Sequence, residues 1–221
     1  MSERMLAAVL ASGGMDSCVA TAWAARRYRL AMLHVNYGQR TEAKELECFR
    51  RQVEHFGAEH SLAVAAPHLG LIGGSSLTDT RIDVPEDDVP GRVPSTYVPF
   101  RNANLLAIAV SWAETLRAGR VVIGAVEQDA PGYPDCRPAF YDAANRLIDL
   151  GTRPDTQIRV ETPLIDLKKA DVVRLGADLG APFDLTWSCY RAEQRPCRHC
   201  ASCRRRAEAF AEAGLPDPLA G

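Results

Sequence analysis

The turn formed by residues 12–17, with the sequence Ser-Gly-Gly-Met-Asp-Ser, constrains the fold of this 221-residue chain more than any other feature. A short apolar run without a clear period, residues 6–11, precedes the turn, and residues 15–27 carry apolar side chains at helical spacing. Such a run is typical of a parallel strand that is buried on both faces. Glycines let a backbone approach an anion closely, and the free N–H groups at a helix start favour bound phosphate. The turn therefore predicts a phosphate site between a buried strand and a helix.

The spacing of this turn separates it from two other phosphate-binding loops. A Walker A loop needs a lysine directly after its last glycine, and a dinucleotide-binding turn needs Gly-x-Gly-x-x-Gly. Ser12 and Ser17 would add hydroxyl donors, whereas the carboxylate of Asp16 would repel a phosphate. We therefore expect Asp16 to orient Mg²⁺ or to cap the helix. A glycine-rich turn with a serine cap and no ligand is the alternative.

Apolar runs and helical patterns alternate along the chain as far as residue 179. The predicted strands are residues 6–11, 30–35, 61–65, 120–126 and 157–161. The predicted helices are residues 15–27, 41–56, 101–116, 137–150, 168–179 and 201–213. This alternation is typical of βαβ units, so we predict an α/β fold with a parallel sheet and helices on both faces. The ligand site should lie at the carboxyl ends of the strands.

Residues 70–95 interrupt the alternation. They contain two adjacent glycines, three prolines and an acidic group, Glu86-Asp87-Asp88. A long solvated loop and a mobile lid over the site are both consistent with this composition, since long loops in compact domains are often functional.

Four of the seven cysteines crowd into the C-terminal part of the chain, at Cys189, Cys197, Cys200 and Cys203. Four thiolates with two-residue gaps are typical of a closed, structural zinc site. We predict one such Zn²⁺ in a segment, residues 185–221, that packs on an ATP-binding and catalytic domain, residues 1–184. Three alternatives remain open for these cysteines: a redox or persulfide-carrying cysteine pair, an iron–sulfur cluster, and a zinc ribbon that binds RNA.

Composition excludes several other classes of protein. A net charge of -2 argues against nucleic-acid binding driven by bulk charge, and no apolar run is long enough to span a membrane. The odd number of cysteines argues against a disulfide framework. We expect a cytoplasmic protein with no direct nucleic-acid partner and no membrane contact.

The whole chain, from about residue 6 to residue 210, resembles the QueC family of 7-cyano-7-deazaguanine synthases, within the PP-loop ATP-pyrophosphatase superfamily. The turn of residues 12–17 is similar to the PP-loop signature Ser-Gly-Gly-x-Asp-Ser. The resemblance also rests on residues 36–40, 98–102, 127–129, 132–137 and 162–164, and on the four clustered cysteines. The family often has Gln in place of Met15, usually Gly in place of Phe100 and commonly Thr in place of Gln128.

This resemblance implies an adenine-nucleotide α-hydrolase-like, Rossmann-like fold with a zinc-binding tail. It also implies ATP-dependent conversion of 7-carboxy-7-deazaguanine and ammonia into 7-cyano-7-deazaguanine (preQ0), which feeds queuosine biosynthesis. Because neither carboxylate oxygen is a leaving group, we expect ATP, with Mg²⁺, to adenylate the carboxylate and then the amide. The family further implies a homodimer.

The predicted site residues fall into three groups. The ATP-binding group is Ala11, Ser12, Gly13, Gly14, Met15, Asp16, Ser17, Cys18, Val19, Ala20, Thr21 and Arg40. The substrate-binding group is Arg101, Asn102, Glu127, Asp129, Tyr133, Asp135 and Arg137, in which carboxylates would accept the N–H donors of the deazaguanine. Asp16, Ser17 and Arg101 are the predicted catalytic residues.

Alternatives remain open for several of these residues. Arg40 and Arg101 could simply begin helices, the acidic group could bind Mg²⁺ or be solvated, and Tyr133 could pack on its own loop. Three other functions stay open as well. They are a PP-loop tRNA thiolase, a QueC-like enzyme acting on another carboxylate such as one on a protein partner, and a non-catalytic zinc-dependent interaction module.

Overall fold

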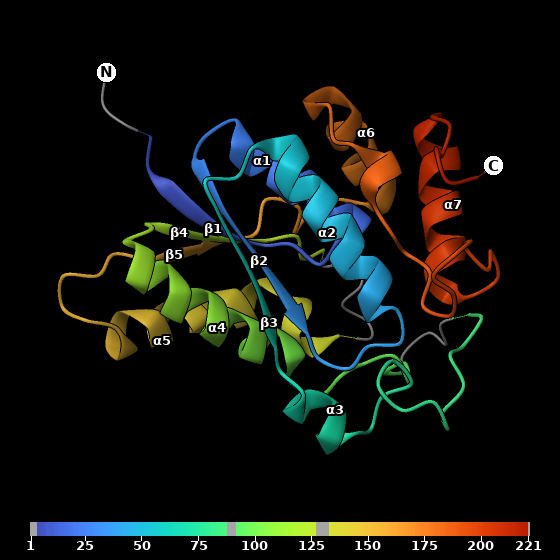
Figure 1. The fold of residues 1–221 in the computed structure, drawn as a ribbon, viewed down its shortest axis with the longest axis horizontal. Helices are drawn as coiled ribbons and strands as arrows, with labels where there is room; N and C mark the ends of the chain where they lie inside the picture. Colours follow the sequence, from blue (N-terminus) through green and yellow to red (C-terminus); the bar gives the residue numbers. More distant parts are fainter. Residues whose placement is uncertain (1–3, 88–91, 127–132, 221) are drawn as a thin grey trace.

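A five-stranded parallel sheet forms the centre of the protein in a computed structural model that describes residues 4–87, 92–126 and 133–220. The strand order is β3-β2-β1-β4-β5, and every neighbouring pair is parallel (Figure 1). The strands are β1 (Leu6–Leu10), β2 (Arg29–Asn36), β3 (His60–Ala65), β4 (Arg120–Ile123) and β5 (Arg159–Glu161). The predicted α/β fold with a parallel sheet is confirmed.

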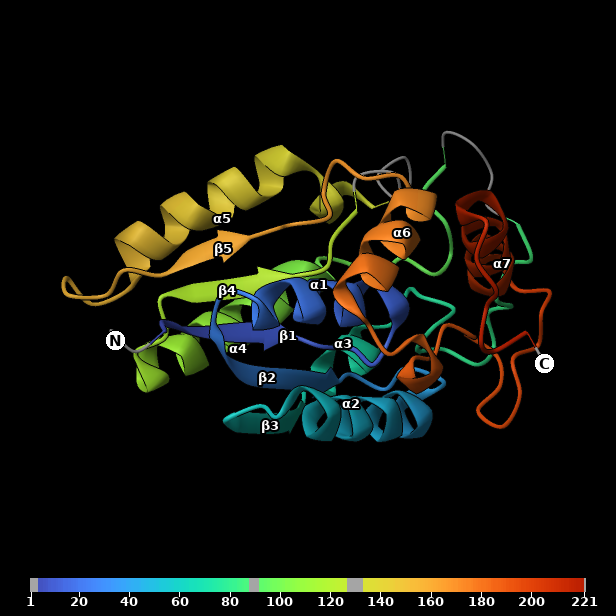
Figure 2. The same cartoon turned by 90° about the horizontal axis from the view of Figure 1, so that it is seen from above.

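Helices cover both faces of this sheet (Figure 1). They are α1 (Met15–Ala25), α2 (Glu42–Phe56), α3 (His68–Ile72), α4 (Arg101–Leu116), α5 (Pro138–Gly151), α6 (Lys169–Leu179) and α7 (Ala201–Ala213). One buried cluster joins the sheet to α4 and α5, and a second joins it to α1, α2, α6 and α7. Figure 2 shows α7 beyond the carboxyl ends of the strands, so the C-terminal segment closes that end of the sheet.

Three predicted strands are shorter in the structure, and β1 loses one residue because it ends at Leu10. Strand β4 ends at Ile123, whereas the sequence predicted it to continue to residue 126. A Cβ on Gly124 would lie 2.9 Å from the backbone nitrogen of Ser17, so the chain leaves the sheet here to pass close to the start of α1. Strand β5 begins at Arg159 instead of residue 157. The sequence also missed α3, because five residues are too few to reveal a helical period.

The described part of residues 70–95 is partly buried and partly exposed to solvent. Ser75 and Ser76 are fully buried, and Leu77 and Val84 are nearly so. The Arg40 guanidinium donates to the carbonyl oxygens of Ser76 (2.6 Å), Asp79 (3.0 Å) and Ile82 (2.6 Å). These bonds hold the segment against the start of α2. Residues 88–91, including Asp88, lie outside the described residues.

The backbone is strained at the residue that precedes α4. Phe100 adopts the left-handed conformation, with φ 56° and ψ 28°, and its side chain is 64% exposed. This conformation costs a residue with a Cβ roughly 1–2 kcal/mol, and glycine avoids that cost but loses more entropy on folding. We expect Phe100→Gly to raise the free energy of unfolding by about 0.5–1 kcal/mol, measured by urea denaturation. Phe100→Ala keeps the strained backbone, so an equal gain in that variant would contradict this explanation.

The C-terminal segment packs directly on the sheet domain. The rings of Phe183 and Phe210 meet edge to face with centroids 5.1 Å apart, and the Arg206 guanidinium donates to the Phe183 carbonyl oxygen at 3.3 Å. The division of the chain between residues 184 and 185 stays a prediction. Among the described residues, no helix is both long and apolar enough to cross a bilayer.

Candidate active site and metal centre

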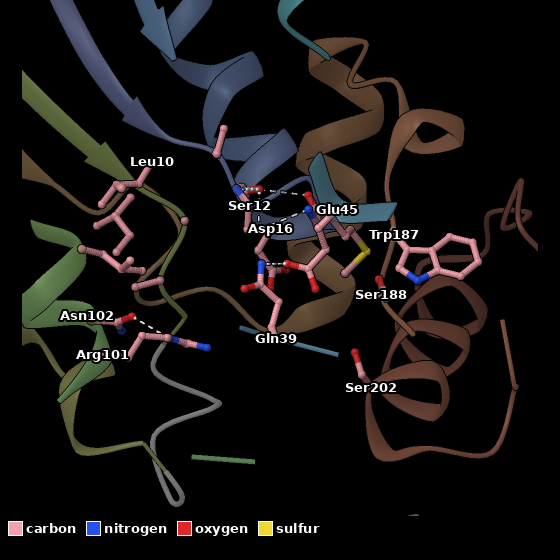
Figure 3. Close-up of a pocket in the computed structure, with 18 of the residues that line it drawn as sticks. Leu10, Ser12, Asp16, Gln39, Glu45, Arg101, Asn102, Trp187, Ser188 and Ser202 are labelled. Atoms are coloured by element: carbon pink, nitrogen blue, oxygen red, sulfur yellow. Dashed lines mark hydrogen bonds between the residues drawn. The ribbon is translucent and has the colours of Figure 1, made fainter. Parts of the chain in front are cut away.

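A cavity of about 270 Å³ lies at the carboxyl ends of β1, β2 and β4. The strand order places β1 between β2 and β4, so the chain crosses over in opposite directions on its two sides. Crevices at such a switch point are the usual ligand sites of open parallel sheets. The starts of α1, α2 and α4 supply three walls of the cavity, and the C-terminal segment supplies the fourth (Figure 3).

Residues 12–17 form a tight turn that is held by its two serines. The Ser12 and Ser17 hydroxyls lie 3.1 Å apart, and the Gly14 N–H donates to Ser12 Oγ at 3.2 Å. Gly13 has φ 85°, and a Cβ there would overlap the backbone carbonyl oxygen of Glu45. Only glycine therefore fits where the turn touches α2.

Asp16 forms an ion pair with a residue far away in the sequence. Its Oδ2 accepts a hydrogen bond of 2.6 Å from Nζ of Lys169, the first residue of α6. Its Oδ1 is buried and has no hydrogen-bond partner among the described residues. A buried carboxylate oxygen without a donor suits a hard cation such as Mg²⁺, and the lysine ammonium beside it suits a phosphate.

The start of α4 forms a second wall. The Arg101 guanidinium donates to the Tyr37 hydroxyl at 3.3 Å, and Figure 3 shows this side chain directed into the cavity. The Asn102 backbone N–H donates to Oδ2 of Asp135 at 3.0 Å, and its side-chain amide donates to the Asp135 carbonyl at 3.1 Å. Asp135 therefore caps α4 from a buried position next to the cavity.

The third wall consists of the start of α2 and the residues just before it. Glu45 accepts hydrogen bonds from the Thr41 hydroxyl at 2.8 Å and from the Gln39 amide at 3.1 Å. Burial raises the pKa of the Glu45 carboxyl to about 7, because a desolvated carboxylate loses the stabilisation that water gives its charge. This wall thus holds a carboxyl group that titrates near neutral pH.

The C-terminal segment forms the fourth wall. The Trp187 backbone N–H donates to the Gly13 carbonyl at 2.9 Å, which ties this segment to the turn. Ser188 and Ser202 face the cavity from this side in Figure 3. The buried Arg206 guanidinium binds the Thr186 hydroxyl at 2.7 Å and fixes the segment at the base of α7.

The four clustered cysteines come together beside this wall. Their sulfur atoms all lie within 4.8 Å of one another, and Cys197 Sγ is 4.0 Å from Cys203 Sγ. Four sulfurs bound tetrahedrally at ~2.3 Å from one zinc ion lie roughly 3.8 Å apart. The backbone N–H of Cys197 donates to Cys189 Sγ at 3.3 Å, and the N–H of Cys200 donates to Cys197 Sγ at 3.4 Å. The cluster therefore fits a single metal ion bound by thiolates.

The arginines around the cluster contact other parts of the same chain. Arg204 pairs with Asp87 at 2.7 Å and with Glu86 at 3.7 Å. Arg191 also pairs with Glu86 and donates to the Val84 carbonyl. These guanidinium groups are engaged by Val84, Glu86 and Asp87 of the same chain. They therefore give less support to the alternative of a zinc ribbon that binds RNA.

The chain matches a known protein family over most of its length. A family profile described as "Queuosine biosynthesis protein QueC" matches residues 6–214. The chain belongs to the QueC family.

Proteins named 7-cyano-7-deazaguanine synthase are similar to this QueC-family chain over nearly its full length. The protein from Chlorobaculum parvum is 56% identical over 217 residues, which are 97% of this chain and 96% of that protein. The protein from Acidobacterium capsulatum is 54% identical over 222 residues, 98% of this chain and 96% of that protein.

Solved structures at low identity share the fold. The U34-tRNA thiolase NcsA from Methanococcus maripaludis has a TM-score of 0.53 and 16% identity, and the match covers 95% of this chain and 64% of that one. An NMN synthetase from Francisella tularensis has a TM-score of 0.51 and 14% identity, with 97% and 79% covered. Both likenesses support the PP-loop type of fold alone.

The structure brings part of the predicted ATP-binding group of this QueC-family member to the cavity. Ala11, Ser12, Gly14, Met15, Asp16, Ser17 and Arg40 line it. Cys18, Val19, Ala20 and Thr21 do not line the cavity, since all four are fully buried within α1. Burial raises the pKa of the Cys18 thiol to about 12, which keeps it protonated. The guanidinium of Arg40 donates to carbonyls of residues 76–82, so phosphate binding by Arg40 stays a prediction.

The predicted substrate group divides in a similar way. Arg101, Asn102 and Tyr133 line the cavity, whereas Asp135 lies behind Asn102. Tyr133 contacts the segment that precedes α4: its hydroxyl lies 2.6 Å from Thr96 Oγ1, and its ring packs against Tyr97. Arg137 is exposed and donates to the Pro134 carbonyl, away from the cavity. Glu127 and Asp129 lie outside the described residues.

Several cavity residues were missed by the sequence interpretation. They are Gln39, Thr41, Glu45, Lys169, Trp187, Ser188, Tyr190, Ser202, Arg205 and Arg206. Gln39 lies within a segment on which the QueC resemblance rests, yet the pattern assigned it no role. Lys169 follows another such segment, residues 162–164, and only the folded structure places it beside Asp16.

Proposed function

We propose that this chain is an ATP-dependent C–N ligase that converts 7-carboxy-7-deazaguanine and ammonia into 7-cyano-7-deazaguanine, in queuosine biosynthesis. The observation that carries the proposal is the 56% identity, over 97% of this chain, to a protein named for that activity. The cavity supports it, because a phosphate-binding turn faces a wall that holds arginine, asparagine and tyrosine side chains.

The first step would be adenylation of the substrate carboxylate. The N–H groups of residues 12–17 would bind ATP phosphates at the start of α1. The Lys169 ammonium would neutralise charge that builds on the phosphates, and Oδ1 of Asp16 would hold Mg²⁺. The carboxylate oxygen attacks the α-phosphorus, the bond to pyrophosphate breaks, and an acyl adenylate forms.

Ammonia would then attack the acyl carbon and displace AMP, which gives the amide. A second ATP would adenylate the amide oxygen as pyrophosphate and one N–H proton leave. Loss of AMP together with the second N–H proton would then give the nitrile. Arg101, directed into the cavity, would hold the negatively charged carboxylate before it is activated. Hydrogen bonding of Asn102 or Asp135 to the base stays a prediction of the same scheme.

The metal at the four cysteines is proposed to be one structural Zn²⁺. When bound, it cross-links the C-terminal segment by coordination to Cys189, Cys197, Cys200 and Cys203. The NcsA thiolase was solved with its [4Fe-4S] cluster, so an iron–sulfur cluster is the rival occupant. Sulfur atoms within 4.8 Å of one another favour a single ion, since a four-iron cluster is itself several ångströms across. Metal analysis and the visible absorption of iron–sulfur clusters distinguish the two occupants.

Isotope exchange between pyrophosphate and ATP tests the proposed function. Labelled pyrophosphate should enter ATP only when 7-carboxy-7-deazaguanine is present, with ammonium left out. This result would show reversible adenylation of that carboxylate. Exchange that a different carboxylate supports, but the deazaguanine does not, would favour the alternative acceptor. Absence of exchange from folded, metal-loaded protein with either would contradict the adenylation scheme.

The remaining expectations concern assembly and location. We propose a homodimer in the cytoplasm that acts on small molecules and binds neither nucleic acid nor membrane. Light scattering of the purified chain tests the dimer, and a monomeric mass would contradict it.

A further inference from the structure

Glu45 places a carboxyl group on the α2 wall of the cavity, and the adenylation scheme assigns it no role. Both of its oxygens accept hydrogen bonds, from Thr41 at 2.8 Å and from Gln39 at 3.1 Å, and both donors are neutral. Among the described residues, Glu45 forms no ion pair with a lysine, arginine or histidine. A half-buried carboxylate that no cation contacts directly is poorly stabilised, so this site favours a positively charged ligand.

The position of Glu45 is close to where an acyl adenylate would form. Its backbone carbonyl lies against Gly13 of the phosphate-binding turn, and its side chain lines the cavity. Figure 3 shows Glu45 and Gln39 side by side, next to the turn that carries Ser12 and Asp16. The hydrogen bonds from Thr41 and Gln39 hold the carboxyl group in this direction.

The proposed reaction needs a cation at this place. Ammonia is almost entirely ammonium at neutral pH, and ammonium has no lone pair with which to attack carbon. A group in the cavity that binds the cation and removes a proton from it would supply the nucleophile directly at the acyl carbon. We propose that Glu45 binds ammonium and accepts the proton that converts it into the attacking ammonia. This inference rests on the proposed function and assigns the nucleophile site within it.

The step balances in atoms and electrons. One N–H bond of ammonium breaks, its proton moves to the Glu45 carboxylate, and the electron pair remains on nitrogen. That pair forms the bond to the acyl carbon, while the C–O bond to AMP breaks and its pair leaves with the phosphate. The new C–N nitrogen still carries three hydrogens, and loss of one further proton to water leaves the neutral amide. A proton acceptor works best when its pKa is near the working pH, and burial brings the pKa of Glu45 to about 7.

The charged groups around Glu45 are consistent with this role. Arg101 acts on it from α4 and lowers its pKa, whereas Glu42 on the same helix raises it. Asp16 and Lys169 lie on the α1 and α6 side of the cavity and neutralise each other. A structural role is the alternative, since Glu45 also holds Gln39, whose Oε1 accepts from the Tyr37 backbone N–H.

The variant Glu45→Gln separates these explanations, because glutamine keeps the shape of the side chain but can neither carry the charge nor accept the proton. We expect kcat/KM for ammonium to fall by at least about 100-fold, with substrate-dependent pyrophosphate exchange unchanged. Hydroxylamine is uncharged at neutral pH, so hydroxamate formation should proceed as in the wild type. Glu54→Gln makes the same change on the exposed face of α2 and should leave every rate unchanged.

Three outcomes would overturn the inference. The first is an unchanged kcat/KM for ammonium in Glu45→Gln. The second is an equal loss of exchange, hydroxylamine use and ammonium use, which would assign Glu45 a positioning role. The third is absence of exchange in the wild type, which refutes the proposed function itself and is thereby distinguished from the other two.

Discussion

Replacing Cys200 with serine is expected to remove the metal and to release the C-terminal wall of the cavity. Cys200 is fully buried, and it is the N-cap residue that directly precedes α7. Structural zinc sites of four thiolates contribute roughly 10–16 kcal/mol of apparent binding free energy. Because serine is a poor zinc ligand, we expect the metal content to fall from one ion per chain to nearly none. The metal is measured by plasma mass spectrometry of the purified variant.

The same variant should lose local structure without unfolding completely. The sheet domain has its own buried clusters on both faces, whereas the wall that carries Ser188 and Ser202 depends on the segment that the proposed metal would cross-link. Limited proteolysis should therefore cut Cys200→Ser after residue 184 and leave the preceding part intact. Cys48→Ala is the matched control, since Cys48 is a buried cysteine packed beside the cluster without belonging to it. Stoichiometric metal in Cys200→Ser, or its loss in Cys48→Ala, would contradict the assignment.

Replacing Lys169 with alanine is expected to lower the rate of pyrophosphate exchange by about 10²–10³-fold, the usual cost of losing one preorganised group that stabilises developing charge. Lys169 Nζ lies 2.6 Å from Asp16 Oδ2 in the turn of residues 12–17, where we propose that phosphate binds, and its side chain is only 17% exposed. Without the ammonium, Asp16 keeps a negative charge next to the site of the phosphates. The lost attraction of the ammonium for the phosphates and the remaining repulsion by the Asp16 carboxylate both weaken ATP binding.

Lys168→Ala is the matched control for Lys169→Ala. Lys168 precedes Lys169 directly, but it is exposed and does not line the cavity. We expect Lys168→Ala to exchange pyrophosphate at the wild-type rate. Equal losses in the two variants would show that the start of α6 matters only for stability, and an active Lys169→Ala would refute the role of its charge. Urea unfolding of both variants checks that the fold is retained.

Features with a strong local signal were predicted well from the sequence. Strand β1 and the turn after it follow from an apolar run that ends in glycines, and α7 was predicted with its observed bounds, Ala201–Ala213. The four cysteines were recognised because their spacing along the chain already requires them to be close. In each case the information lies within about 15 residues, where period and spacing decide the structure.

Features that depend on contacts between distant residues were missed or left open. Lys169 and Asp16 are 153 positions apart, so no local pattern links them. Glu45 belongs to an α2 whose exposed side is rich in charge, and nothing in the local pattern separates it from its solvated neighbours. Residues 73–87 resemble a solvated loop in composition, yet Arg40, Arg191 and Arg204 hold them from three places in the chain.

The Phe100 position shows how a family pattern and a backbone angle inform each other. The sequence marked Phe100 as a departure from the glycine usual in the family, without a physical reason. The left-handed backbone at φ 56° supplies the reason, since glycine alone adopts it without a steric cost. Phenylalanine at this position therefore lowers stability at the start of α4, next to Arg101. It does not change the residues that line the cavity, because Phe100 is not one of them.

Mass spectrometry of a complete reaction tests the proposed activity most directly. Metal-loaded protein would be incubated with Mg-ATP, ammonium and 7-carboxy-7-deazaguanine, and both the deazaguanine and the nucleotide would be identified. We predict 7-cyano-7-deazaguanine together with two molecules of AMP for each nitrile. Nitrile accompanied by ADP would contradict adenylation, and the absence of both amide and nitrile from folded, metal-loaded protein would contradict the proposed function.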